Sequence, residues 1–446
     1  VQMGYPGSRQ SFWQQIGRSG RGTRDAVSVF VPSHSTLDQY ILHHPEYVLE
    51  KDHENAVVDL ENNPVYLQHI NCAAQEIPLT HGDATLFGGK QRLKEAVEYG
   101  RQIGDLEGSL EGGVMYAHRD RPQDTVSLYA SGGDTFDVRL ADEDTSFDHQ
   151  SIGRDRAYRD YHEGATVLYQ GDQYQVTTLR EDLPQPYIEL SQVNVDYYTQ
   201  SQGQVNIYDT EVHESRNIGR FRLNWGYGTV SIQYNSYLKR EIGSGELREI
   251  GLKTGVPSLE MRTQLCWIEV PDRVEQAMLN KHSDYQNPDC VDIPARLHGY
   301  LGGIHAIEHA MIAVSPLELK VDADDLGGLA TNRLPDNHET SGWFIYDGIE
   351  GGLGFSRSIY NEFEAVAHRA QDLISDCPCG HDEGCPACTM DDRCGNDNKP
   401  LYSPAATDIL GQLTHTDNMD HLADYFPDDE SDETGNDERR PPASIS

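Results

Sequence analysis

Five of the chain's eight cysteines fall between Cys377 and Cys394, and this clustering constrains the fold more than any other feature of the sequence. Cys385 and Cys388 form a C-x-x-C pair, which Cys377 and Cys379 precede. Two thiolates of a C-x-x-C turn reach one metal ion, and four thiolates make a closed tetrahedral site without an open catalytic position. The sequence therefore predicts a structural zinc site whose ligands are Cys377, Cys379, Cys385 and Cys388.

Other readings of the cluster remain open at the level of sequence. Cys394 can replace Cys379 if the C-x-C geometry is too strained, and His381 is a further candidate ligand. An iron–sulfur cluster uses the same thiolates, and a redox pair or free thiols need no metal. We expect no secretory or transit peptide, so tight clustering in a large chain indicates metal binding in a reducing cytoplasm rather than a disulfide scaffold.

Charge is the strongest feature of the composition, with 35 basic against 73 acidic residues and a formal net charge of -38. A nucleic-acid-binding protein ordinarily carries a basic stripe, so one reading is a protein that avoids nucleic acid. Because the acidity runs through every region, we favour a halophilic protein kept soluble in salt by its charge. In molar salt the counterion-release part of DNA affinity is largely gone, so the missing basic stripe does not exclude DNA.

Hydrophobic patterning predicts a multi-domain α+β chain, since 446 residues suffice for two to four domains. No apolar run reaches membrane-spanning length, so we expect no membrane partner. We predict five regions, namely an α/β segment (1–45), which the resemblance described below implies is the end of a RecA-like domain, a winged-helix-like domain (46–124), a β-rich domain (125–290), a helical zinc-binding domain (291–425) and a disordered acidic tail (426–446).

Within these regions, periodicity predicts individual elements. Apolar spacing of three and four residues predicts helices that begin at Asn63 and cover Gln91–Arg101, Leu297–Val314, Ser356–Ser375 and Ala405–Leu413. Alternating or continuous apolar runs predict strands at Ala26–Val31, Val114–Ala117, Val126–Tyr129, Thr135–Leu140, Ala165–Tyr169, Tyr174–Leu179, Thr229–Tyr234, Cys266–Val270 and Phe344–Tyr346. The continuous run Ala26–Val31 is typical of a strand that is buried on both faces of a parallel sheet.

A second motif lies at Gln14–Arg21 and has the pattern Q-x-x-G-R-x-G-R. Arg18 and Arg21 project the same way from a helical turn, and their guanidinium groups can meet the oxygens of a γ-phosphate held by a neighbouring domain. Gly17 lets the backbone approach a nucleotide. An arginine in this position neutralises the charge of a phosphoryl-transfer transition state. The alternative is an ordinary turn rich in arginine and glycine.

The stretch QMGYPGSRQSFWQQIGRSGR resembles the run from motif V through motif VI of superfamily 2 helicases. The following LDQYILHHPEYVLE resembles the MrfA/YprA branch of these helicases, which is related to RecQ-like enzymes. The resemblance implies that Arg18 and Arg21 are arginine fingers, and that Gln14 and Gly17 join them in facing the nucleotide.

The chain departs from the complete helicase pattern, because it has neither a G-x-x-x-x-G-K-[ST] P-loop nor a D-E-x-H box. We therefore expect the first RecA-like domain, which binds ATP and Mg²⁺, to lie outside this chain and in cis with it. Arginine fingers without a phosphate cradle have nothing to act on. This chain alone should accordingly not hydrolyse ATP.

The stretch HAIEHA places His305, Glu308 and His309 in the H-x-x-E-H pattern of some zinc proteases. Paired histidines on one helix face more often satisfy buried hydrogen bonds. The order of HAIEHA, YDGIEGGLGF and CPCGHDEGCPAC resembles the C-terminal zinc-binding domain of MrfA-like helicases. That resemblance implies that His309 or Glu308 pairs with Asp347 to brace the domain.

A third candidate is the stretch RDRAYRDYHEGATVLYQGDQYQV, which resembles the β-domain of the same family. Its cations and aromatic rings can contact phosphates and stack on bases, and a solvated charged face is the alternative. The residues concerned are Arg154, Arg156, Tyr158, Arg159 and Tyr161.

The motifs and the family resemblance together predict the C-terminal part of an ATP-dependent DNA helicase with a structural Zn²⁺. Its expected partner is DNA that is single-stranded or has a single-stranded tail, and the family resemblance implies DNA repair. The alternative is a non-motor, zinc-containing DNA-binding or interaction subunit that works beside a separate helicase.

Overall fold

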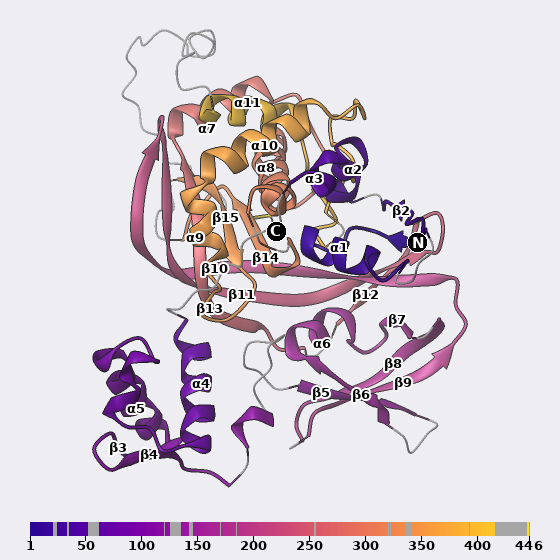
Figure 1. Ribbon diagram of the computed structural model, residues 1–446. Coiled ribbons are helices and arrows are strands. Elements are labelled where there is room, and N and C mark those ends of the chain that lie inside the picture. The colour runs from indigo at the N-terminus through magenta and orange to yellow at the C-terminus, as the bar shows by residue number, and fades with distance from the viewer. Residues whose placement is uncertain are drawn as a thin grey trace. The chain divides into compact units, whose positions relative to one another are not determined.

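The computed structural model describes residues 1–20, 25–33, 35–51, 62–119, 121–124, 135–141, 146–169, 171–183, 185–253, 256–319, 321, 323–335, 340–391, 393–414 and 444–445. The chain divides into two units (Figure 1). Unit 1 comprises residues 1–57, 195–348 and 354–446, and unit 2 comprises residues 58–194 and 349–353.

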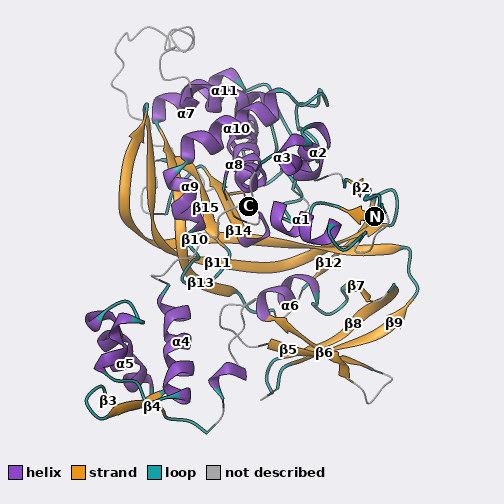
Figure 2. Cartoon of the chain, viewed as in Figure 1, coloured by secondary structure: helices purple, strands orange, loops and turns teal. Residues whose placement is uncertain are grey.

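Unit 1 is built on a seven-stranded sheet. Six of its strands follow the order β10-β11-β13-β15-β14-β16, and the seventh, β12, pairs with β11 outside this order. Its strands are β10 (Tyr197–Ile218), β11 (Phe221–Glu241), β12 (Leu247–Leu252), β13 (Leu259–Val270), β14 (Leu326–Thr331), β15 (Ser341–Asp347) and β16 (Ser444–Ile445), all antiparallel to their neighbours. β10 and β11 have 22 and 21 residues, whereas ordinary strands have about 3–10. Three register shifts interrupt their pairing, and such bulges bend a strand, as the curved strands in Figure 2 show.

Helices pack on this sheet around α8 (His298–Glu318), which is buried along nearly its whole length. The other helices are α7 (Asp272–Lys281), η3 (Ala295–Leu297), η4 (Ala323–Asp325), α9 (Phe355–Asn361), α10 (Phe363–Ser375) and α11 (Ser403–Thr414). A Cβ atom on Gly303 would lie 2.7 Å from the Cβ of Ala405, so glycine lets α8 approach α11 closely. Among the described residues, we find no helix with the length and apolarity to span a membrane.

The N-terminal segment also belongs to unit 1 and contributes β1 (Gln2–Met3), α1 (Arg9–Ile16), β2 (Phe30–Val31), α2 (Thr36–His43) and α3 (Glu46–Leu49). The buried Tyr47 hydroxyl donates to the Pro316 carbonyl over 2.9 Å, which ties α3 to the end of α8. The Thr36 hydroxyl donates to the Pro386 carbonyl over 3.1 Å and so ties α2 to the cysteine segment.

The prediction of a buried strand over Ala26–Val31 was wrong. Only Phe30–Val31 is a strand, which pairs with β1 in parallel, and Val27 is 86% exposed. No further strand covers this pair in the part of the chain that the structure describes. An apolar run becomes a buried strand only where neighbouring strands or helices cover both of its faces.

Unit 2 begins with a small helical core and continues into a five-stranded sheet. The first part contains α4 (Asn63–Glu76), η1 (His81–Thr85), α5 (Lys90–Ile103), β3 (Leu106–Ser109), β4 (Gly113–Tyr116) and η2 (Pro122–Asp124). Ile70, Leu93 and Val114 are fully buried in its core. The second part has the strand order β6-β5-β9-β8-β7, with β5 (Thr135–Leu140), β6 (Ser146–Gly153), α6 (Arg154–Asp160), β7 (Thr166–Tyr169), β8 (Asp172–Arg180) and β9 (Tyr187–Val193).

The expected β-rich domain over 125–290 differs from the structure, because its strands fall in two sheets. β5 to β9 belong to unit 2, whereas β10, β11 and β13 share the sheet of β14 and β15 in unit 1. The C-terminal region is therefore not purely helical, since its helices cover this sheet. The predicted strand Val126–Tyr129 and most of the tail 426–446 lie outside the described residues.

Candidate zinc centre and nucleotide-facing turn

The structure brings the four cysteines Cys377, Cys379, Cys385 and Cys388 together, with all four sulfur atoms within 4.8 Å of one another. The Cys385 sulfur lies 3.7 Å from the sulfurs of both Cys377 and Cys388. Four sulfurs at about 2.3 Å from one zinc ion form a tetrahedron with edges of about 3.8 Å. The cluster therefore fits a single tetrahedral ion, whereas thiolates of an iron–sulfur cluster are spread over several irons.

Local backbone structure prepares this cluster for thiolates. The Cys385 amide donates to the Cys388 sulfur over 3.1 Å, and the Ala387 amide donates to the Cys385 sulfur over 3.3 Å. Gly384 has a φ of +78°, and a Cβ there would lie 1.8 Å from the Thr389 hydroxyl, so the turn requires glycine. Burial raises the pKa of the Cys377 thiol to about 11, and a bound cation would reverse this by holding the thiolate.

A second group of potential metal ligands consists of His305, His309 and Cys394, all buried in unit 1. The structure thus places Cys394 in this group and not in the place of Cys379, and exposed His381 belongs to neither group. Burial lowers the pKa of both imidazoles, and the neighbouring His309 lowers that of His305 further. Both rings are therefore neutral at pH 7, which is the form that binds metal ions.

The protease reading of H-x-x-E-H does not fit this environment. His305, Glu308 and His309 are at most 5% exposed inside α8, and the third side chain beside the two imidazoles is the Cys394 thiol. A catalytic zinc keeps an open position that water and substrate reach. The buried setting of this group instead suits a structural role.

Asp347 braces the fold by accepting hydrogen bonds from backbone amides, whereas the resemblance implied that it pairs with His309 or Glu308. The His309 Nδ1 contacts the Thr389 carbonyl, and the Glu308 Oε2 has no hydrogen-bond partner among the described residues. The buried Asp347 carboxylate accepts hydrogen bonds from the amides of Gly354, Phe355 and Ser356 at 2.7–3.1 Å. It therefore binds the start of α9, where the amides of a helix lack helical partners.

The Q-x-x-G-R-x-G-R motif lies at the exposed end of α1. Gln14 and Arg18 are exposed, and Gly17 ends the helix by donating its amide to the Trp13 carbonyl over 2.8 Å. The Trp13 indole donates to the Val48 carbonyl over 2.8 Å, which anchors the helix to α3. Arg21 lies outside the described residues. The described part of the motif thus presents polar groups to solvent from an anchored helix.

The arginine-rich stretch of α6 is better explained by ion pairs within unit 2. Tyr158 is 2% exposed and its hydroxyl contacts Glu181, so its ring cannot stack on a base. Arg156 and Arg159 both pair with Asp160, at 3.8 and 3.1 Å. The expectation of a stacking surface that includes Tyr158 was therefore wrong, because this ring is needed in the core.

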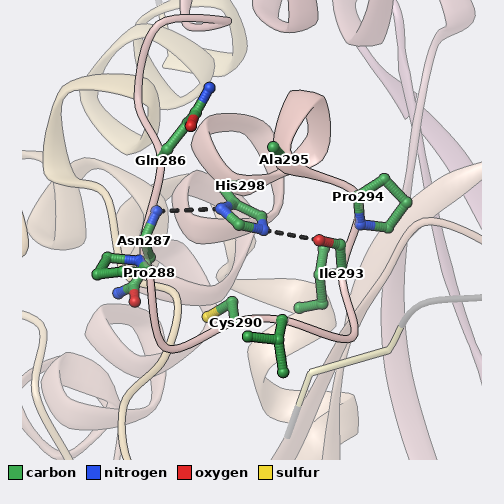
Figure 3. Close-up of a pocket in the computed structure, with 9 residues that line it drawn as sticks. Gln286, Asn287, Pro288, Cys290, Ile293, Pro294, Ala295 and His298 are labelled. Carbon is green, nitrogen blue, oxygen red and sulfur yellow. Dashed lines mark hydrogen bonds between the residues drawn. The ribbon is translucent and has the colours of Figure 1, made fainter.

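A depression at the surface of unit 1 is lined by a single segment, Gln286–His298 (Figure 3). The His298 Nδ1 accepts a hydrogen bond from the Asn287 amide, and its Nε2 donates to the Ile293 carbonyl. Both ring nitrogens are therefore used to hold the segment. We assign no function to this depression.

Comparisons with known proteins agree with this arrangement. The MrfA Zn-binding domain model matches residues 307–389, and the winged helix domain model of the ATP-dependent helicase HRQ1 matches residues 58–129. The uncharacterised ATP-dependent helicase YprA of Bacillus subtilis (strain 168) is 28% identical over 399 residues, which cover 87% of this chain and 48% of YprA. The chain is thus homologous to the MrfA/YprA-like helicases and carries two of the domains found in them.

Other relatives show the same relation. The ATP-dependent helicase HRQ1 of Saccharomyces cerevisiae is 22% identical over 443 residues, which cover 95% of this chain and 38% of HRQ1. The crystal structure of the DUF1998 helicase MrfA bound to DNA has a TM-score of 0.54 and 24% identity, and the match covers 93% of this chain and 52% of MrfA. The chain thus spans about half the length of its MrfA/YprA-like relatives or less, and the winged helix and zinc-binding domains are established.

Proposed function

We propose that the chain is the C-terminal part of an ATP-dependent DNA helicase and that it completes an ATPase site in a domain outside this chain. The observation that carries the proposal is the exposure of Gln14, Gly17 and Arg18, the described part of the Q-x-x-G-R-x-G-R motif, at the end of α1. In this proposal Arg18 and Arg21 contact the γ-phosphate, and Gln14 and Gly17 face the nucleotide. ATP and Mg²⁺ would supply the phosphoryl group and its charge compensation.

The contacts that hold α1 link this turn to the zinc-binding domain, which supports a transfer of movement between them. Trp13 anchors α1 to α3, and Tyr47 of α3 donates to the Pro316 carbonyl at the end of α8. The Arg9 guanidinium lies over the Tyr47 ring, 4.7 Å from its centre. We propose that movement of the turn during ATP hydrolysis is transmitted through these contacts to α8.

We further propose that Cys377, Cys379, Cys385 and Cys388 bind one structural zinc ion and that the accessory domains bind DNA. DNA is the bound ligand in the MrfA structure that this chain resembles. Helix α5 of the winged helix domain carries Lys90, Arg92, Lys94 and Arg101 although the whole chain has a net charge of -38. The second helix of a helix-turn-helix module ordinarily enters the major groove, so α5 is the DNA-facing helix in this proposal.

The decisive experiment is ATPase activity of the full-length protein with and without single-stranded DNA in high salt. We expect DNA-stimulated turnover that falls by about 10³-fold or more in Arg18→Ala and Arg21→Ala. Gln15→Ala is a matched control, because Gln15 is an exposed neighbour on α1 outside the motif pattern. This control should keep the activity of the wild type.

Two outcomes would overturn the proposal. A folded, zinc-loaded protein without DNA-stimulated turnover would favour a non-motor DNA-binding subunit that works beside a separate helicase. Equal losses in Gln15→Ala and Arg18→Ala would show that the helix matters for stability and not for catalysis. DNA repair, and a preference for single-stranded DNA or tails, remain parts of the proposal that need substrates of defined structure.

A further inference from the structure

We propose that His305, His309 and Cys394 bind a second zinc ion, separate from the ion of the four-cysteine cluster. This inference goes beyond the helicase function and does not depend on it. The match to the MrfA Zn-binding domain covers residues 307–389, so two of these three side chains lie outside it. Their potential ligand atoms all lie within 4.8 Å of one another.

Hydrogen bonds on the far side of both imidazoles orient them for metal binding. The His305 Nδ1 lies 2.8 Å from the Pro400 carbonyl, and the His309 Nδ1 lies 2.7 Å from the Thr389 carbonyl. A carbonyl can only accept, so each Nδ1 carries the proton and each Nε2 keeps a free lone pair. Histidines that bind metal ions ordinarily donate from their other nitrogen in this manner.

The distance between nitrogen and sulfur fits a shared ion. The His305 Nε2 lies 3.5 Å from the Cys394 sulfur. A zinc ion bonded to nitrogen at about 2.05 Å and to sulfur at about 2.3 Å, with a tetrahedral angle, places these two atoms about 3.6 Å apart. His305 and His309 are one helical turn apart on α8, and their ring centres are 4.3 Å apart.

The segment that carries Cys394 is fixed from its other side. The Asn398 amide donates to the Cys394 sulfur over 3.3 Å, as amides do to the sulfurs of the four-cysteine cluster. The Gly203 amide of β10 donates to the Gly395 carbonyl over 3.2 Å, and Asp397 pairs with Arg240 of β11. These contacts hold the Cys394 thiol against α8 even in the absence of a metal ion.

Charge in this region also favours a cation. The Oε2 of Glu308 is buried and has no hydrogen-bond partner among the described residues. Glu308 and Asp391 both act electrostatically on Cys394, and Arg393 lies 3.6 Å from Asp391 and offsets its charge. A divalent ion bound by one thiolate and two neutral imidazoles would carry one net positive charge beside these acidic side chains.

The donor set selects the class of metal. One soft thiolate and two imidazoles suit zinc and do not suit magnesium or calcium, which prefer oxygen. The group offers three ligand atoms, so the fourth position falls to water or, after rotation of its side chain, to Glu308. The ion would fasten the segment 389–400 to α8.

The first test needs no substitution and uses the full chain, loaded with Zn²⁺ and then freed of excess metal. We expect two zinc ions per chain by elemental analysis. X-ray absorption at the zinc edge should show a mixed shell of sulfur and nitrogen. One zinc per chain with a shell of sulfur alone would overturn the proposal, and the three side chains would then share only a thiol–imidazole hydrogen bond.

Substitutions separate the two sites. Cys394→Ser should lower the content from two zinc ions to one and leave a shell of sulfur alone, whereas Cys385→Ser should enrich the shell in nitrogen. Cys266→Ser is the control, because Cys266 is buried in β13 and belongs to neither group, and it should keep two ions. A folded Cys394→Ser protein that retains two zinc ions would also contradict the second site.

Discussion

Asp347 shows how one buried carboxylate can determine where a helix starts. Its replacement by alanine leaves the amides of Gly354, Phe355 and Ser356 without their acceptor. We expect Asp347→Ala to lower the free energy of unfolding by about 2–4 kcal/mol, because each buried unsatisfied group is unfavourable by about 1–3 kcal/mol. Urea unfolding measures this change.

The matched control for this prediction is Asp372→Ala on α10, where the carboxylate is exposed. Exposed substitutions ordinarily change stability by about 0.5 kcal/mol or less. If both variants lost the same stability, the hydrogen bonds of Asp347 would not be the reason for its effect.

Asp408 predicts a dependence of stability on pH. Burial alone would raise its pKa, but hydrogen bonds from His282 at 2.8 Å and Lys281 at 2.7 Å outweigh burial and hold the pKa below its usual value. A lowered carboxylate pKa contributes stability above the unfolded value of about 3.9, and this contribution is lost as the pH falls through the folded pKa.

We therefore expect the wild type to exceed Asp408→Asn in free energy of unfolding at pH 6. The difference should shrink as the pH falls below about 4. Any zinc that is lost at low pH is lost from both proteins, so its contribution cancels in the difference between their free energies of unfolding. A difference that stays constant from pH 6 to pH 3.5 would contradict the role of the ionised Asp408.

At the level of residues, sequence spacing was enough to single out the four cysteines that the structure brings together, because they lie close along the chain. Cys394 and His305 are 89 positions apart, and no local pattern indicates that α8 and the cysteine segment meet there. The only sequence indications of this group were the two histidines one helical turn apart and Cys394, which the four-cysteine site does not use. The motif singled out Arg18, whose role as an arginine finger stays a prediction, and only the structure shows that Arg18 is exposed at the end of α1.

Among the elements, the contact between α8 and α11 gives a third prediction. Gly303 has no room for a side chain, since its Cβ would lie 2.7 Å from the Cβ of Ala405. We expect Gly303→Val to destabilise unit 1 by about 1–3 kcal/mol, which is typical of overpacking in a core. Gly411→Val tests whether any added side chain has this effect, because a Cβ at Gly411 meets only the Gln371 side chain at 3.7 Å.

Periodicity located most helices and short strands, because amphipathic spacing reflects local burial. The predicted helix Ser356–Ser375 is interrupted at Glu362, which separates α9 from α10. β10 was not predicted, because Gln200 to Gln204 is polar and lacks alternation. Sequence patterns also could not predict that the strands of 125–290 divide between two sheets, because β13 pairs with β15, which is distant in the sequence.

For the whole molecule, zinc removal should affect one region first. Thiolate–metal binding is coupled to folding, and Thr389 and Pro386 connect the cysteine segment to α8 and α2. We expect a chelator to increase hydrogen exchange and proteolysis in residues 295–414 before the winged helix domain is affected. Equal protection of 295–414 with and without chelator would contradict a structural role for the metal.

Net charge predicts the response of the molecule to salt. With a charge of -38, like charges repel, and salt screens them because the Debye length falls from about 10 Å at 0.1 M to about 3 Å at 1 M. We expect the free energy of unfolding to rise between 0.1 and about 2 M NaCl. A free energy of unfolding that stays constant over this range of NaCl would contradict this explanation and weaken the proposal of a halophilic protein.

The short parallel pair of β1 and β2 has a consequence for how copies of this chain behave together. Met3 and Val27 are 83% and 86% exposed, and Val29 is 47% exposed. Among the described residues no third strand pairs with β1 or β2, and an unpaired strand edge with apolar side chains is a template on which another chain can add a strand. At low ionic strength, mutual repulsion keeps copies apart, whereas concentrated salt removes this colloidal barrier and strengthens apolar attraction. The same concentrated salt that favours the folded chain would therefore also promote self-association of this chain through this edge.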